Sequence, residues 1–282
     1  LESTAEDKGA PGWDEEYGWG LVDAQAALEE SGAVEANWTF MVYLDGDNNL
    51  EGAGIDDMNE MEVVGSTSNV NIVVQFDRIP GYDSTNGNWT GTRRYYVTHD
   101  ADPFTINSNL IQDLGEVNMA DPNTLVNFTE WAMQNYPADH YALILWNHGS
   151  GWKYPKNGRD LFKCVIYDDT SGGDDLSMQE LQLALNTIKT DTGKKMDVLG
   201  FDACLMQMIE VAYQVKDYSD VMVGSEEIEL GNGWPYNTIL SNLTANPLMT
   251  PSGLGSEIVA DYIASYGTSE SETQSAANQT HR

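Results

Sequence analysis

The stretch that decides the fold is residues 197–215, DVLGFDACLMQMIEVAYQV. An apolar run of strand length, Asp197–Phe201, leads directly into the polar residues Asp202 and Cys204. The next residues, Leu205–Val215, have the composition of a helix. A strand that passes straight into a helix is the basic unit of α/β proteins, so this stretch predicts such a unit with a cysteine at its junction.

Four other apolar runs repeat this strand pattern along the chain. They are WTFMVYL (38–44), VNIVVQF (70–76), YALILW (141–146) and DVMV (220–223). Strands that are apolar on both faces are typical of a parallel sheet covered by helices on each side. We therefore predict an α/β fold, a three-layer sandwich with a mostly parallel central sheet, with Arg93–Thr98 as an inserted strand or hairpin.

Helix signals lie between these runs. Leu50–Val64 has apolar residues at helical spacing, Asp121-Pro122 is a capping pair, and Ser177 with Glu180 forms a capping box. The alternation of strands and helices predicts right-handed crossovers between parallel strands.

The first 36 residues differ in composition from the rest. Residues 12–30, GWDEEYGWGLVDAQAALEE, resemble the C-terminal tail of subtilisin-like serine peptidases, with a short helix over Leu21–Glu30. We interpret 1–36 as a tail, a linker or the remnant of a preceding domain. Residues 37–282 form the second domain. We expect it to continue beyond Arg282, because residues 269–280 read as the start of a further segment.

The composition excludes several classes of partner. The formal charge is −32, from 45 acidic and 13 basic residues, so nucleic acid and anionic membrane surfaces are not expected partners. No apolar run approaches the roughly 18 residues of a membrane helix, so no membrane insertion is expected. Two cysteines are too few for a disulfide scaffold, although a single Cys164–Cys204 bridge is an alternative.

The candidate catalytic residues follow from the strand ends. Parallel α/β sheets bind ligands beyond the carboxyl ends of their strands, where this chain places Asn147-His148-Gly149 and Asp202-Ala203-Cys204. Cys204 is the candidate nucleophile and His148 its proton-transfer partner. A hydrogen-bonded structural histidine and a buried cysteine are the alternative.

Three further roles depend on this placement. A helix beginning at Cys204 would favour its thiolate, and the backbone N–H groups of Gly149 and Cys204 would donate to an oxyanion. Asp202 shares a strand face with Cys204, so its carboxylate either lines a pocket for a cationic side chain or caps the helix.

A possible calcium loop begins at the end of the first strand. Asp45, Asp47, Asn49 and Asp56 occupy positions one, three, five and twelve of an EF-hand pattern. Position six is Leu50 instead of glycine and position twelve is not Glu, so a polar turn that caps the first helix is the preferred interpretation.

Together these segments resemble the clostripain family of cysteine peptidases, relatives of caspases, legumain and gingipains. The motifs are WTFMVYLDGDNNLE, VVQFDR, YALILWNHGSGW, DVLGFDACLMQMIEVAYQV and SEEIELGNGWPY. The resemblance implies a caspase-like fold, a His148–Cys204 dyad and cleavage after Arg or Lys. It assigns Asp202 to an acidic pocket with a second acid from Glu226, Glu227 or Glu229, of which we favour Glu227 and Glu229.

The resemblance also implies regulation and location. Family members are typically secreted, calcium-responsive and activated by internal cleavage, so we expect an extracellular or cell-surface protein. Calcium is the one expected cofactor, with no organic cofactor. Its ligands are not identified by the pattern, although carboxylates are abundant at Asp168, Asp169, Asp174 and Asp175.

The basic residues gather in one place. Lys153, Lys156, Arg159 and Lys163 all lie within residues 153–163, directly after the histidine motif. An enzyme that prefers Arg or Lys would find its own substrate there, so we predict self-cleavage in this window. A solvated basic patch is the alternative.

Two classes of function remain in competition. The first is a cysteine endopeptidase whose partners are proteins or peptides with basic residues. The second is a non-catalytic module that binds calcium or a basic partner. The pattern does not indicate an oligomeric state.

Overall fold

The computed structural model describes residues 6, 15, 35–152 and 165–267. The chain divides into two compact units, Leu1–Glu35 and Ala36–Arg282. The predicted N-terminal helix, the basic window 153–163 and the end of the chain from residue 268 lie outside the described residues.

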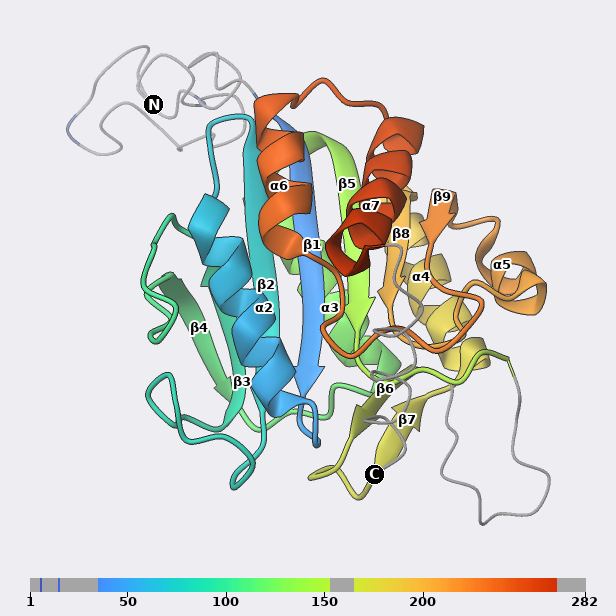
Figure 1. Cartoon of the computed structure of the whole chain (residues 1–282). Helices are drawn as coiled ribbons and strands as arrows, with labels where there is room; N and C mark the ends of the chain where they lie inside the picture. Colours follow the sequence, from blue (N-terminus) through green and yellow to red (C-terminus); the bar gives the residue numbers. More distant parts are fainter. Residues whose placement is uncertain (1–5, 7–14, 16–34, 153–164, 268–282) are drawn as a thin grey trace. The chain divides into compact units, whose positions relative to one another are not determined.

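The larger unit is built on a seven-stranded sheet within the described residues, with strand order β4-β3-β2-β1-β5-β8-β9 (Figure 1). Its parallel strands are β1 (Ala36–Gly46), β2 (Val70–Arg78), β5 (Ala138–Trp146), β8 (Met196–Asp202) and β9 (Ser219–Val223). The antiparallel strands β3 (Gly91–Tyr96) and β4 (Asn109–Gly115) form one edge. A separate hairpin consists of β6 (Val165–Asp168) and β7 (Asp174–Leu176).

Helices cover both faces of the sheet. They are α2 (Glu51–Val64), α3 (Pro122–Asn135), α4 (Met178–Thr192), α5 (Ile209–Val215), α6 (Tyr236–Ala245) and α7 (Pro251–Tyr266). In Figure 1, α2, α6 and α7 lie in front of the sheet, and α3 and α4 lie behind it. The predicted three-layer α/β sandwich with a mostly parallel sheet is confirmed.

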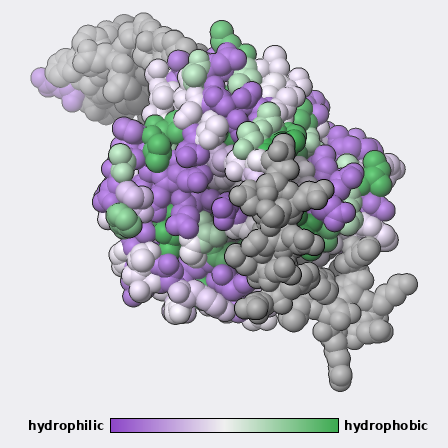
Figure 2. Space-filling model, viewed as in Figure 1, coloured by the Kyte–Doolittle hydropathy of each residue, from purple (hydrophilic) through white to green (hydrophobic). Residues whose placement is uncertain are grey.

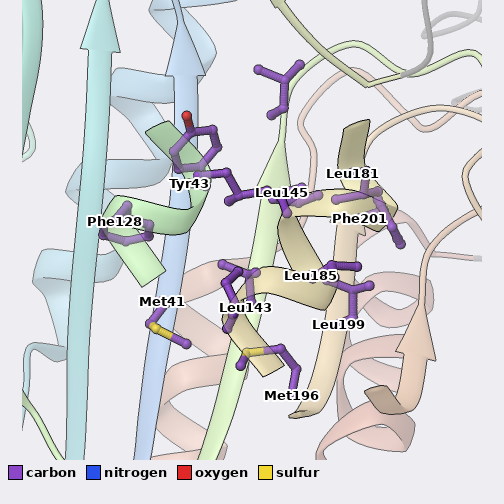
Figure 3. Packing of buried hydrophobic residues seen from close by; sticks show 14 of the residues in the cluster. Met41, Tyr43, Phe128, Leu143, Leu145, Leu181, Leu185, Met196, Leu199 and Phe201 are labelled. Atoms are coloured by element: carbon purple, nitrogen blue, oxygen red, sulfur yellow. The ribbon is translucent and has the colours of Figure 1, made fainter. Parts of the chain in front are cut away.

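The side chains of the central strand β1 alternate between two cores. Met41 and Tyr43 point to the face that carries α3 and α4, where they join Leu143, Leu199 and Phe201 (Figure 3). The intervening residues of β1 contribute to a second core beneath α2, α6 and α7. This burial on both faces explains why β1 is a nearly continuous apolar run.

The predicted helix caps are present. The Asp121 side chain accepts a hydrogen bond from Asn123 N before Pro122, and Ser177 with Glu180 forms both bonds of the capping box. Each cap satisfies backbone N–H groups that the first helical turn leaves without partners.

One prediction of local structure needs correction, and several elements were not predicted. The helix after Cys204 begins at Ile209 instead of Leu205, because residues 203–207 form an irregular turn. The inserted strand predicted over Arg93–Thr98 is present as β3, which spans Gly91–Tyr96. It pairs with β4, a strand that was not predicted. Helices α6 and α7 were not predicted either, although Thr250-Pro251 is a capping signal of the same kind as Asp121-Pro122.

The visible surface is largely hydrophilic, with separate hydrophobic spots (Figure 2). In the described part of the chain, no helix combines the length and the apolar character needed to cross a bilayer.

Candidate active site

The predicted catalytic residues come together at the carboxyl ends of β5 and β8. Trp146 and Asp202 pair in register as the last residues of these parallel strands. His148 and Cys204 each follow two residues later, and both line one cavity of about 80 Å³. The sheet register therefore delivers the imidazole and the thiol to the same place.

Gly149 lets the two strand-end loops touch. A Cβ atom added at Gly149 would lie 2.5 Å from the carbonyl oxygen of Cys204 and 3.0 Å from the Ala203 side chain. Real Cβ atoms do not approach a backbone oxygen so closely, so only glycine fits between the loops at their present separation.

Replacing Gly149 with alanine should therefore push the His148 and Cys204 loops apart. We expect a loss of about 1–3 kcal/mol in the free energy of unfolding, as for other overpacked sites, measured by urea denaturation. Gly52→Ala is the matched control, because an added Cβ there meets only the Asp83 carboxylate, at 3.7 Å. Equal stability of both variants would show that the loops can separate without cost.

Cys204 lies on a strained turn instead of a helix start. Leu205 has φ of 65°, a left-handed conformation that leucine rarely adopts, and its N–H donates to the Glu227 carbonyl oxygen at 3.0 Å. The expectation that a helix dipole stabilises the thiolate is therefore wrong. Cys204 is a free thiol, which excludes the alternative of a bridge to Cys164, itself outside the described residues.

The surroundings of Cys204 favour the neutral thiol. Burial raises its pKa above the ordinary value, and the negative charges of Glu229 and Asp202 raise it further. The backbone N–H groups of Glu229 and of Cys204 itself donate towards the sulfur and oppose this shift.

His148 is held by an asparagine that the sequence analysis did not assign to this role. The Asn49 side-chain oxygen lies 2.8 Å from His148 Nε2. Because an amide oxygen only accepts hydrogen bonds, Nε2 carries the proton, and Nδ1 of the neutral ring keeps its lone pair. Desolvation lowers the pKa of His148, partly opposed by the charge of Asp169, so the neutral ring is favoured.

Asn147 fixes the loop after β5, which carries His148, through buried hydrogen bonds. It is buried, its Nδ2 donates to Asp45 Oδ2 at 2.6 Å, and its Oδ1 accepts from the His148 backbone N–H. The same Oδ1 accepts from Asn48 Nδ2 at 3.3 Å. These bonds connect the loop after β5 to the loop after β1, where Asn49 lies.

Three buried carboxyl groups line the cavity next to Cys204. Asp202 accepts from Trp234 N at 3.2 Å and from the Tyr236 hydroxyl at 3.0 Å. Glu229 accepts from Trp234 Nε1 at 3.0 Å, and Asp57 of α2 accepts from Trp146 Nε1 at 2.6 Å. The set of Asp57, Asp202 and Glu229 is called the acid pocket below.

Burial and mutual repulsion raise the pKa values of the three carboxyl groups in the acid pocket. Burial raises the pKa of Asp202 to about 7. Burial, the charge of Asp202 and a hydrogen bond shared with Asp202 raise the pKa of Glu229 well above its ordinary value. Burial and the charge of Asp202 raise the pKa of Asp57 well above its ordinary value. A cation among the three groups would relieve this repulsion.

Two of the three acids were predicted and one was missed. Glu229 and Asp202 line the cavity, whereas Glu227 lies outside it with an exposed side chain, as does Glu226. Asp57 was missed because it sits within the first helix, where an acid normally faces solvent. The helix pattern gave a weak signal, since Asp57 lies next to Met58 on the buried side.

A second group of acids converges near the β1–α2 loop. The carboxylate oxygens of Asp47, Asp77, Glu116 and Asp168 all lie within 4.8 Å of one another, and we call these residues the four-acid cluster. Of the acids suggested by the sequence, Asp169, Asp174 and Asp175 are not members of the group found in the described residues.

The EF-hand pattern does not form a calcium loop. Helix α2 already begins at Glu51, so Asp56 is an exposed helical residue and cannot close a loop with Asp45. The predicted polar turn is present, because Asn48 Oδ1 accepts from Leu50 N at 2.8 Å. The predicted cap is not, because among the described residues no side chain caps the first turn of α2.

Comparison with known proteins gives consistent matches. Residues 42–279 match the family model described as the clostripain family. Clostripain from Hathewaya histolytica is 32% identical over 222 residues, which cover 73% of this chain and 42% of that protein. The chain thus spans less than half the length of this relative.

Two solved structures show the same fold. A secreted C11 cysteine protease from Bacteroides thetaiotaomicron, in complex with an irreversible peptide inhibitor, is 27% identical with a TM-score of 0.63. The match covers 82% of this chain and 59% of that one. An inactive zymogen C11 protease from Parabacteroides distasonis, 24% identical with a TM-score of 0.62, covers 83% and 59% and shows the fold alone.

Proposed function

Since the chain belongs to the clostripain family, we propose that it is a cysteine endopeptidase that hydrolyses peptide bonds after Arg or Lys. The observation that carries this proposal is the single cavity shared by His148, Cys204 and the acid pocket. The imidazole and thiol supply covalent chemistry, and the buried carboxyls supply recognition of a cationic side chain.

The reaction follows from the resting protonation states. Cys204 holds its proton and His148 is neutral, so His148 Nδ1 accepts the thiol proton as the sulfur attacks the scissile carbonyl carbon. The backbone N–H groups of Gly149 and Cys204 are the proposed donors to the resulting oxyanion. His148 then protonates the leaving amine, and water hydrolyses the thioester.

Binding of a basic substrate side chain in the acid pocket would help to activate the Cys204 thiol. The charges of Glu229 and Asp202 raise the pKa of Cys204. An Arg or Lys side chain bound between these carboxylates cancels that charge and lowers the pKa of Cys204 when the scissile bond is in place. The nucleophile is thus less reactive in the absence of a substrate.

We also propose self-cleavage after a basic residue of the window 153–163. Its supporting observation is the β-bridge between Gly149 and Val165, which brings the two described ends of this segment to the edge of the active site. Secretion is proposed from the Bacteroides relative, which is a secreted protein.

Reporter peptides ending in Arg, Lys, citrulline or Asp test the proposed function. We expect hydrolysis of the Arg and Lys peptides alone, dependent on reducing agent and lost after thiol alkylation. A protein that hydrolyses none of them and is unchanged by alkylation would instead fit the non-catalytic binding module.

Replacing Asn49 with alanine should lower kcat by up to about 10²-fold, because His148 loses its fixed orientation. KM should change little, since Asn49 is not among the residues that line the cavity. Asn49→Asp keeps an acceptor for Nε2 and should restore part of kcat, while shifting the pH profile by raising the pKa of His148. An unchanged kcat in Asn49→Ala would remove Asn49 as a positioning residue.

A further inference from the structure

One wall of the acid pocket is formed by a segment without regular structure. Residues 229–233, called the pocket wall below, follow β9 and precede α6, and most of them line the cavity beside Cys204. They form neither helix nor strand, although the Gly233 N–H donates to the Leu230 carbonyl oxygen at 2.9 Å and closes a turn. A surface segment of this kind needs contacts with a rigid element to keep one shape.

Two tyrosine hydroxyls of α7 supply these contacts. Tyr262 accepts a hydrogen bond from Leu230 N at 3.0 Å. The Tyr266 hydroxyl donates towards the carbonyl oxygens of Gly233 at 2.9 Å and Leu230 at 3.2 Å, and the Asn232 N–H donates towards it in turn. In the part of the chain that the structure describes, the backbone hydrogen bonds that join this turn to the rest of the fold all go to these two hydroxyls.

The two tyrosines act from one face of their helix. They are four residues apart, and their ring centroids are 5.0 Å from each other. Burial raises the pKa of Tyr262 to about 12 and also raises the pKa of Tyr266. Both hydroxyls therefore stay protonated over the range in which Asp202, with a pKa of about 7, changes its charge.

Helix α7 is a firm support for these side chains. A Cβ atom added at Gly255 would lie 2.8 Å from the Val221 side chain, so the helix packs closely on β9. Asn242 of α6 donates to Asp261 of α7 at 3.0 Å, and Ile258 is buried in the core below. A group on a packed helix can place a loop more exactly than a group on another loop can.

The hydroxyls do more than satisfy the backbone of the turn. Gly231 and Asn232 are exposed, so water can reach this part of the pocket wall and pair with its polar groups. Protein hydroxyls in place of water fix the position of the turn relative to α7. Their main contribution is therefore to the shape of the pocket.

A small movement of the pocket wall would change the pocket. A Cβ atom added at Gly233 would lie 3.3 Å from both carboxylate oxygens of Asp202 and 3.5 Å from Asp57 Oδ2. The wall thus borders the acids directly, in a cavity of only about 80 Å³. A wall that is already fixed raises the affinity for a ligand, because binding does not have to order it.

We propose that Tyr262 and Tyr266 are positioning residues for substrate recognition, which hold the pocket wall against the acids so that one basic side chain fits between them. This inference rests on the proposed function, because it takes the acid pocket as the site for Arg or Lys. It concerns binding of the basic side chain and not the bond-breaking steps at Cys204.

Tyr266→Phe keeps the ring and removes the hydroxyl. We expect the KM for an Arg reporter peptide to rise by about tenfold, whereas kcat should stay within about twofold. Tyr262→Phe, which removes a single hydrogen bond, should raise KM less. Tyr213→Phe is the matched control, because this tyrosine of α5 is exposed, lies outside the cavity and should leave KM and kcat unchanged.

The rate of Cys204 alkylation by iodoacetamide separates recognition from general damage. This small reagent does not need the acid pocket, so its rate should be the same in Tyr266→Phe and in the wild type. A parallel fall in alkylation and hydrolysis would overturn the proposal, and so would a folded Tyr266→Phe protein with an unchanged KM. If Tyr266→Phe does not fold, as judged by circular dichroism, Tyr262→Phe decides by the same comparison.

Binding of a blocked arginine gives a readout that needs no catalysis. N-acetylarginine amide is titrated by NMR into the full chain carrying Cys204→Ala, and adding Tyr266→Phe should weaken its binding by about tenfold. This result in a protein that hydrolyses no reporter peptide would contradict the peptidase function and support the tyrosine pair. Hydrolysis of Arg peptides with equal affinities in both chains would do the reverse. Absence of binding with both tyrosines intact would overturn the proposed pocket and the tyrosine pair together.

Discussion

Replacing Cys204 with alanine should reduce turnover of Arg and Lys reporter peptides by about 10³-fold or more, because no other group in the cavity can form the acyl intermediate. The fold should persist, since the Cys204 side chain is only partly buried. The measurement is the initial rate of peptide hydrolysis at equal concentrations of folded protein.

The control is Cys164→Ala, the other cysteine of the chain, which should keep its activity. Mass spectrometry of the same preparations tests self-cleavage: cuts after Lys or Arg within 153–163 should occur in the wild type and not in Cys204→Ala. Full activity in Cys204→Ala would exclude Cys204 as the nucleophile, and full activity of an uncut wild type would exclude cleavage as an activating step.

Replacing Asp202 with asparagine should lower kcat/KM for Arg and Lys peptides by about 10²-fold, as expected when a buried charge partner is lost. Peptides ending in citrulline, which has the shape of Arg without its charge, should be affected far less. Glu226→Gln is the matched control, because this exposed acid lies outside the cavity. An unchanged ratio of Arg to citrulline hydrolysis would place the specificity elsewhere.

The same variant should change the pH dependence of stability. Burial raises the pKa of Asp202 to about 7, above the 3.8 of an unfolded aspartate, so the folded state binds the proton more tightly. The contribution of Asp202 to the free energy of unfolding is therefore full below about pH 4 and is lost as the pH rises through about 7. Asp202→Asn should make urea midpoints depend less on pH over this range.

Much of the fold was predictable because the strands have an unmistakable composition. β1 is buried on both faces, so its apolar run can hardly be anything except a central parallel strand. The same reasoning placed His148 and Cys204 at one sheet edge, since parallel strands end together. By contrast, β4 is largely exposed and has no comparable run, so its pairing with β3 was not visible in the sequence.

The details of the site depend on contacts that no local pattern records. Asp57 belongs to the acid pocket because the fold brings this residue of α2 next to Trp146, the last residue of β5, which donates a hydrogen bond to it. The four-acid cluster joins residues up to 121 positions apart, from Asp47 to Asp168, so no sequence window contains it. The turn at Cys204 was not predicted because the residues after Cys204 have a helical composition. In the structure Leu205 has a left-handed backbone conformation, which interrupts a helix at this point.

Because β5 and β8 are neighbours in the sheet, a cut in the segment between them would turn one folded chain into two chains that share that sheet. Residues up to 152 supply β1 to β5, and residues from 165 supply β6 to β9, so the two pieces share one sheet and both cores. Folding of the intact chain is a unimolecular event, independent of dilution. A cut chain is an obligate heterodimer whose stability depends on concentration, so denaturation in a dilute medium becomes irreversible. Cleavage would thus give the protein a finite lifetime after its first unfolding.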